Sequence, residues 1–265
     1  MITELITQEF VSVTVDGAVA VVTLDRPPVN ALNEQVATEL GEAFRACEDP
    51  AIRAVVVTGR PHFAAGADIK GFKEVYDSGS KEMTAATLLN SIEVLEKLAK
   101  PTIAAVHGYA LGGGCELSLG CDFRYMADDA KIGQPEILLG IIPGAGGTQR
   151  LGRVVGFQRA KELVMTGRHV DAEEAFAMGY ADKVTTPDDL LDLALVDAAD
   201  WATKATVALG AAKRAVNDGW GRPMEEALAI EAEAFAVSFA SEDALEGITA
   251  FIEKREADFK RRCRC

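Results

Sequence analysis

The fold depends most on the glycine-rich stretch Gly108-Tyr109-Ala110-Leu111-Gly112-Gly113-Gly114-Cys115-Glu116-Leu117. A second stretch of the same character is Gln134-Pro135-Glu136-Ile137-Leu138-Leu139-Gly140-Ile141-Ile142-Pro143-Gly144. Each places one glutamate among apolar residues and glycines, where an ionised carboxylate is costly unless it has a partner or a chemical role. Glu116 and Glu136 therefore predict one pocket that performs acid–base chemistry at a carbon centre.

The composition is that of an ordinary globular protein with an acidic excess. The 265 residues suffice for one large domain, or for one domain with a smaller appendage. The net charge of −14 opposes nucleic-acid binding, because no basic excess is available to neutralise phosphates. The five cysteines are odd in number and lack zinc spacing, which predicts reduced thiols. We see no secretory leader and no uncharged apolar run of about 18 residues, so we expect a cytoplasmic protein without membrane contact.

Turn signals and periodicity around the two stretches predict an α/β protein. Asp16-Gly17 between two β-rich runs indicates a hairpin. Strand signals disappear from about residue 190, so we expect a core of residues 1–190 that carries the site and a helical C-terminal subdomain of residues 191–265. The predicted helices are 34–47 with Asn33 as its cap, 82–98, one from within 112–114 to 119, and one from Asp171 to Gly179; the predicted strands are 10–15, 18–24, 53–58, 102–106 and 122–126.

The glycines match neither of the common nucleotide-binding loops. The run 108–114 is wrongly spaced for a dinucleotide fingerprint, and Gly144-Ala145-Gly146-Gly147-Thr148 lacks the lysine of a phosphate loop. The first amides of a helix carry partial positive charge, and glycines let a carbonyl oxygen approach them. A second amide from Ala64-Ala65-Gly66-Ala67-Asp68-Ile69-Lys70 would complete an oxyanion site for a carbonyl that gains enolate character. The residues alone leave open that these glycines only permit tight helix–sheet packing.

Several stretches in the same order resemble the crotonase superfamily of enoyl-CoA hydratases and isomerases, over nearly the whole chain. The resemblance implies a spiral of ββα turns with a helical C-terminal region used in trimerisation, and trimers that commonly pair into hexamers. The matching stretches are Arg26-Pro27-Pro28-Val29-Asn30-Ala31-Leu32, Ala65-Gly66-Ala67-Asp68-Ile69-Lys70, residues 104–117, residues 133–151 and, in the last helix, Phe251-Ile252-Glu253-Lys254-Arg255.

The resemblance also implies an acyl-CoA thioester substrate and assigns the site residue by residue. Glu116 and Glu136 match the two catalytic glutamates of the hydratases. The amides of Ala67 and Gly113 match the oxyanion hole. Further positions match contacts to the substrate or its CoA moiety, the last two of which can come from a neighbouring subunit: Ala65, Gly66, Asp68, Ile69, Lys70, Phe235 and Lys254.

The activity implied by the resemblance is that of an enoyl-CoA hydratase. This hydro-lyase adds water reversibly and syn to a trans-2-enoyl-CoA, giving a 3-hydroxyacyl-CoA, in fatty-acid β-oxidation or a related acyl-CoA pathway. We expect no metal or redox cofactor, because CoA is part of the substrate and His62, His107 and His169 have no ligand spacing. Pro27-Pro28-Val29 and Gly71-Phe72 are more similar to the hydratase/isomerase part of multifunctional enzymes. A Δ3-Δ2-enoyl-CoA isomerase, an enzyme with both activities and a non-catalytic crotonase-like binding module stay as alternatives.

Overall fold

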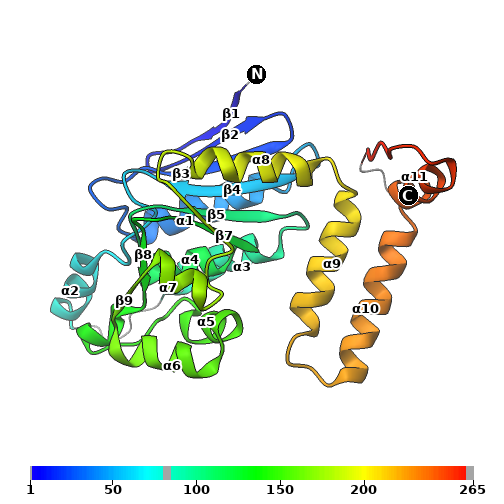
Figure 1. Cartoon of the computed structure of the whole chain (residues 1–265). Helices are drawn as coiled ribbons and strands as arrows, with labels where there is room; N and C mark the ends of the chain where they lie inside the picture. The colour runs from blue at the N-terminus through cyan, green and yellow to red at the C-terminus, as the bar shows by residue number, and fades with distance from the viewer. Residues whose placement is uncertain (1, 80–84, 261–265) are drawn as a thin grey trace.

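Figure 1 shows the computed structural model of the chain, which describes residues 2–79 and 85–260. Within these residues the strands form two sheets. The larger sheet has the order β1-β2-β3-β4-β5-β7-β10, and the smaller has the order β6-β8-β9. Helices pack against the larger sheet or extend away from it, so the predicted α/β class is confirmed.

The larger sheet begins as an antiparallel meander and continues as a parallel sheet. Every residue of its two central strands, β4 and β5, is buried, as expected where helices cover both faces. The antiparallel strands are β1 (Thr3–Thr7), β2 (Val11–Asp16) and β3 (Val19–Leu24), and the parallel strands that follow are β4 (Ala54–Gly59), β5 (Thr102–Val106), β7 (Phe123–Ala127) and β10 (Lys183–Thr185).

The predicted hairpin is confirmed. Asp16 at the end of β2 pairs with Val19 at the start of β3, so that Gly17 and Ala18 form a two-residue loop. Gly17 has a φ of 59°, a conformation that glycine adopts without steric cost. The turn chemistry therefore fixes the register of these strands, as the sequence indicates.

Helices cover the larger sheet. α1 (Glu34–Ala46) packs against α3 (Ala86–Lys97) and β2, while α8 (Leu190–Ala202) crosses β3, β4, β5 and β7. The predicted cap of α1 is confirmed, because Asn33 Oδ1 accepts a hydrogen bond from the Val36 amide at 2.9 Å. The predicted helix at 82–98 corresponds to α3, and its first residues, 82–84, lie outside the described part of the chain.

The smaller sheet brings together β6, β8 and β9 and the helices that follow them. Its strands are only three residues long, and β6 runs parallel to β8 while β8 runs antiparallel to β9. The pairing of Leu111 with Gly133 brings the start of α4 beside the start of η1. The elements are β6 (Tyr109–Leu111), β8 (Lys131–Gly133), β9 (His169–Asp171), α4 (Gly113–Leu119), the 3-10 helix η1 (Pro135–Leu139), α5 (Gly147–Val155), α6 (Phe157–Thr166) and α7 (Ala172–Ala177).

Three helices at the C-terminal end extend away from both sheets, on the right of Figure 1. They are α9 (Thr206–Gly219), α10 (Met224–Phe239) and α11 (Glu242–Glu253), and α9 packs lengthwise on α10. An ion pair of 2.9 Å between Lys213 and Asp122 anchors α9 to the core. A helical C-terminal region is thus confirmed, and its boundary near residue 190 stays a prediction. No helix in the described ranges combines the length and apolar character needed to span a membrane.

Candidate active site

Glu116 lies on α4, a short helix that only glycines allow to sit where it does. Gly112 precedes it with a φ of 51°. A Cβ on Gly114 would lie 2.0 Å from the carbonyl oxygen of Ala64, so no other residue fits this approach. The predicted helix start within residues 112–114 is therefore confirmed, and the loop that contains Ala64 lies directly against it.

The Glu116 carboxylate is buried, with 3% of the residue exposed. Its Oε1 accepts hydrogen bonds from the amides of Ala145 and Gly147, each at 2.7 Å. Burial raises the pKa of Glu116, and this effect outweighs the two amide bonds and the positive charge of Arg150, which lower the pKa. Because both amides bind Oε1, Oε2 is the oxygen left for a reactant.

Glu136 lies on η1 and meets the start of α4. A Cβ on Gly112 would be 2.7 Å from Glu136 Oε1 and 3.8 Å from the Cα of Gly66. Three segments distant in sequence therefore converge at Gly112. Burial, and then the charge of Glu116, raise the pKa of Glu136 to about 7. The two glutamates thus form an electrostatically coupled pair in which one member readily holds a proton near neutral pH.

The amides of Ala67 and Gly113 lie near each other at this junction. A Cβ on Gly113 would be 4.0 Å from the amide nitrogen of Ala67. Leu32 pairs with Ala67 through the carbonyl of Gly66 and the amide of Asp68, so the N–H of Ala67 points away from Leu32. Gly113 is the first residue of α4, and its N–H has no intrahelical acceptor. This pair can hold one carbonyl oxygen.

The loop around Ala67 is fixed by a backbone hydrogen bond on one side and an ion pair on the other. The amide of Ala65 donates to the carbonyl of Val29 at 2.9 Å, and Gly66 has a φ of 97°. Asp68 caps α2 (Ile69–Asp77) and pairs with Arg26 at 2.8 Å. The hydrogen bond from Arg26 is the main reason why the pKa of Asp68 is lowered. Asp68 therefore orients the loop, while Ile69 and Lys70 are exposed beside it.

Phe235 and Lys254 do not join this group within one chain. Phe235 lies on α10 and Lys254 ends α11, and both helices project away from α4 and α2 in Figure 1. Phe235 is 65% exposed, and its ring stacks only on that of Phe239 among the aromatic contacts of the described chain, at 5.7 Å. Within one chain Phe235 and Lys254 therefore lie apart from the two glutamates, and their contact with a substrate stays a prediction.

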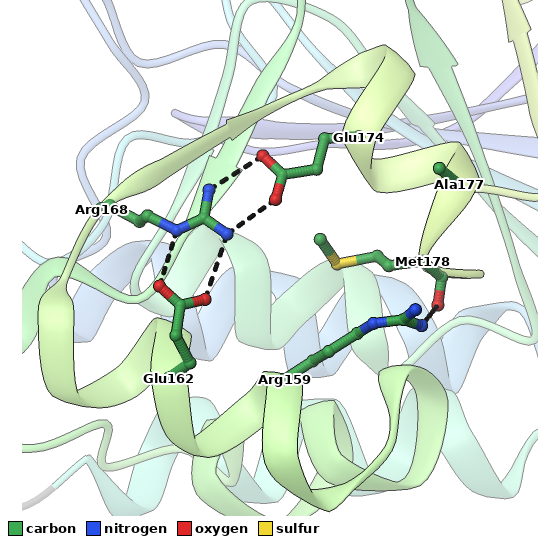
Figure 2. Close-up of a pocket in the computed structure, with 6 residues that line it drawn as sticks. All are labelled: Arg159, Glu162, Arg168, Glu174, Ala177 and Met178. Carbon is green, nitrogen blue, oxygen red and sulfur yellow. Dashed lines mark hydrogen bonds and ion pairs between the residues drawn. The ribbon is translucent and has the colours of Figure 1, made fainter.

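A surface hollow between α6 and α7 lies apart from these residues, and none of them lines it. Arg168 is one of its lining residues and donates to both Glu162 and Glu174 at 2.6–3.0 Å (Figure 2). With both edges of its guanidinium paired to carboxylates, Arg168 links the two helices. Within residues 2–79 and 85–260, no three His, Cys, Asp or Glu side chains are grouped closely enough to hold a metal ion.

Residue-by-residue reasoning missed several groups that support the glutamates. Gln134 is fully buried, and with its amide nitrogen turned toward Glu136 it donates to both carboxylate oxygens at 3.2 Å. The amides of Ala145 and Gly147 bind Glu116, a role that the spacing of this glycine run does not indicate. Cys115, which adjoins Glu116, is completely buried, and burial raises the pKa of its thiol to about 12, so it is no nucleophile.

Comparison with known proteins finds enoyl-CoA hydratases that are similar to this chain over most of its length. A family model described as enoyl-CoA hydratase/isomerase matches residues 14–262. The crotonyl-CoA hydratase of Syntrophomonas wolfei is 43% identical, over 91% of this chain and 94% of its own. The short-chain-enoyl-CoA hydratase of Clostridium acetobutylicum is 43% identical, over 93% and 96%. A crystal structure of an enoyl-CoA hydratase from Bacillus anthracis superposes with a TM-score of 0.88 at 36% identity, over 96% and 100%.

Proposed function

The chain belongs to the enoyl-CoA hydratase/isomerase family, and from this premise we propose that it catalyses the reversible syn hydration of trans-2-enoyl-CoA to 3-hydroxyacyl-CoA. One observation supports the proposal: Glu136 Oε1 lies against Gly112, next to the neighbouring amides of Ala67 and Gly113, and the charge of Glu116 acts on Glu136. Two amide donors and a coupled acid–base pair are what water addition next to a thioester carbonyl requires. The reaction involves no net oxidation or reduction and CoA is part of the substrate, so the proposal includes no metal or redox cofactor.

The two amides act on the thioester carbonyl. They donate to its oxygen and stabilise the negative charge that develops there as the thioester gains enolate character. Withdrawal of electrons toward that oxygen makes C3 of the conjugated double bond electrophilic. Because the donors are backbone groups fixed by a parallel bridge and a helix start, little reorganisation is needed at the moment of reaction.

The two glutamates act on one water molecule. Glu116, held through Oε1, uses Oε2 to orient the water and accept one of its protons as the oxygen bonds to C3. Glu136 delivers a proton to C2, and the pair holds a single proton both before and after the step. The C3–O and C2–H bonds form, while the C2=C3 π bond and one O–H bond of water break. Glu116 gains a proton and Glu136 loses one, and the dehydration direction uses the same groups in reverse.

The direct test is the loss of the enoyl-thioester absorbance on addition of enzyme to crotonyl-CoA and to longer homologues. We expect turnover with at least one chain length and formation of the 3-hydroxyacyl-CoA. A folded enzyme that hydrates none of them would contradict the proposal. The series of homologues also reports the chain-length preference.

Replacing Gly113 by proline removes one oxyanion donor at a helix position that accepts proline. We expect kcat to fall by about 10²–10³, or roughly 2.7–4 kcal/mol of transition-state stabilisation. Gly113→Ala is the matched control, because it keeps the N–H while its Cβ meets the same neighbours, Leu88 at 3.1 Å and Leu32 at 3.2 Å. Steady-state rates on both variants separate the donor from crowding; a proline variant as active as the alanine one would remove Gly113 from the oxyanion hole.

The pH dependence follows from the shared proton. Burial and the charge of Glu116 raise the pKa of Glu136 to about 7, so the pair loses its last proton as the pH rises through that value. We expect kcat/KM to fall there, and to fall identically for hydration and dehydration, because the singly protonated pair serves both directions. Initial rates in both directions across neutral pH test this. A rate that stays constant well above neutral pH would show that Glu136 is not the proton donor.

The C-terminal helices carry the proposed assembly. Several large apolar side chains on α9–α11 or directly after α9 are more than half exposed, as expected for surfaces that pack against other copies: Trp220, Met224, Leu228, Phe235, Phe239 and Phe251. We expect a trimer or a hexamer by light scattering, in which Phe235 and Lys254 reach the site of a neighbouring subunit. Deleting residues 230–265 should dissociate the assembly and abolish acyl-CoA binding; a fully active monomer of the intact chain would contradict this.

A further inference from the structure

The turn that holds Glu116 is itself held from behind by Arg150 of α5. Ala145 donates its amide to Glu116 Oε1 and accepts a 3.0 Å hydrogen bond from Arg150 Nη1 at its carbonyl. One peptide segment thus connects the guanidinium to the carboxylate. Gly146 has a φ of 102°, and a Cβ there would lie 2.1 Å from Nη1. Nη1 of the guanidinium therefore lies directly against the turn, in a space that only glycine leaves open.

Glu96 of α3 fixes the orientation of Arg150. Its Oε2 accepts from Nη2 at 2.7 Å and from Nε at 3.3 Å. The side chain of Arg150 is 13% exposed and that of Glu96 37%, so this pair is shielded more than an ordinary surface ion pair. α3 also supplies Leu88, which lies beside Gly113. Hydrogen bonds between Glu96 and Arg150, between Arg150 and Ala145 and between Ala145 and Glu116 thus connect α3 to the acid–base pair.

We propose that Arg150, oriented by Glu96, is a positioning residue for Glu116: it fixes the turn whose amides hold Oε1 and so aims Oε2 at the reacting water. The inference rests on the function proposed above and names a residue that touches neither substrate nor water. A planar guanidinium can bind a carbonyl and a carboxylate at once in fixed geometry, whereas an ammonium group cannot reproduce both contacts.

The positive charge of Arg150 also supports the role of Glu116 as a base, because it favours the ionised carboxylate. Among the described residues, the ionisable groups that interact electrostatically with Glu116 include Glu136 on η1, Cys115 on the same helix and Arg150 on α5. Arg150 is the cation among these groups, and it lowers the pKa of Glu116 against the effect of burial. Removing this cation should raise the pKa of Glu116, so the ionised base should be lost at higher pH than in the wild type.

A purely structural link between α3 and α5 would predict something different. Loss of such a link would lower the melting temperature, with any loss of activity following the loss of folded protein. A positioning role predicts a folded enzyme in which kcat falls while KM for the thioester stays near the wild-type value, since Arg150 does not contact the substrate. The second readout is the acid limb of the kcat/KM profile, the pH range in which activity falls as Glu116 becomes protonated. A purely structural role would not change the pH of this limb.

The experiment compares Arg150→Met, Arg150→Lys and Glu96→Gln with Arg153→Met in crotonyl-CoA hydration. Arg153 is the matched control, because it lies on the same helix, is exposed and bonds only to the carbonyl of Gln149 among the described residues. For Arg150→Met we expect kcat to fall by about 10-fold to 10²-fold, as for a misplacement of about 1 Å, with the acid limb moved to higher pH. Arg150→Lys should lose part of kcat and keep the acid limb, because it keeps the charge.

A double-mutant cycle with Glu116→Gln locates the effect. If Arg150 acts through Glu116, then Arg150→Met should add little to the loss that Glu116→Gln already causes. Wild-type kcat together with an unchanged acid limb in Arg150→Met would overturn the inference. So would an Arg150→Met change that lowers kcat by the same factor in the Glu116→Gln enzyme as in the wild type. If Arg150→Met does not fold, Arg150→Lys and Glu96→Gln decide: wild-type kcat in both overturns it. Hydration absent from both the wild type and Arg153→Met would instead refute the proposed function.

Discussion

Replacing Glu136 by glutamine is expected to lower the rate of 2-enoyl-CoA hydration and of any 3-enoyl-CoA isomerisation by about 10²–10⁴, the usual contribution of general acid–base catalysis. Both reactions move a proton at C2, and Glu136 is the proposed carrier. Its environment suits the role, because burial and Glu116 raise the pKa of Glu136 to about 7, where a carboxyl group both holds and releases a proton. The measurement is kcat and kcat/KM for both substrates.

The control is Glu173→Gln, which makes the same change on an exposed residue in the first turn of α7. It should leave both rates unchanged. Glutamine is isosteric with glutamate, so the fold around Gln134 and Gly112 should be preserved, and circular dichroism would confirm this. A folded Glu136→Gln enzyme with near-normal hydration would remove Glu136 from the proton path.

Replacing Glu116 by alanine is expected to reduce hydration far more than isomerisation. Hydration needs a second carboxylate to align and deprotonate water at C3, whereas isomerisation moves a proton from C2 to C4 and one base suffices. We expect the hydration rate to fall by about 10²–10⁴. The measurement is the ratio of the two rates on one preparation, because a ratio does not depend on the amount of active enzyme.

Glu116→Ala also leaves the amides of Ala145 and Gly147 without their acceptor, and an unpaired buried donor costs about 1–3 kcal/mol. Glu116→Gln is therefore the companion variant, since its amide oxygen can still accept both bonds while its side chain is no base. Selective loss of hydration in both variants supports the two-carboxylate mechanism. Full hydration in either one would show that mechanism to be wrong, and a wild type that isomerises well but hydrates poorly would favour the isomerase.

Local chemistry was sufficient for the elements whose signals lie within a few residues. Asn33 caps α1 and Asp171 caps α7, because each side chain bonds an amide three residues ahead in its own helix. The hairpin at Gly17 is fixed by its own turn. By contrast, β6, β8 and β9 were not predicted, because strands of three residues are too short to show an alternating pattern and exist only through their pairing.

The functional residues divide in a similar way. Glu116 and Glu136 stand out because a charge among glycines and apolar residues is costly, and their roles, with those of Ala67 and Gly113, came from the resemblance to a family that the comparisons confirm. Gln134 and Arg150 have no such signal in the sequence. Their roles depend on tertiary contacts, with Glu136 and with the carbonyl of Ala145, that the sequence does not show. The roles of Phe235 and Lys254 depend on the proposed assembly and stay predictions.

Residue types and short spacings along the chain were enough to predict the fold class, the family and the two carboxylates, and the family match confirms the first two. The tertiary structure alone decided how those carboxylates differ. The pairing of Leu111 with Gly133 brings Gly112 against Glu136, and the turn before α5 brings two amides to Glu116. Burial and neighbouring charge set protonation, and both are properties of groups brought together from distant parts of the chain.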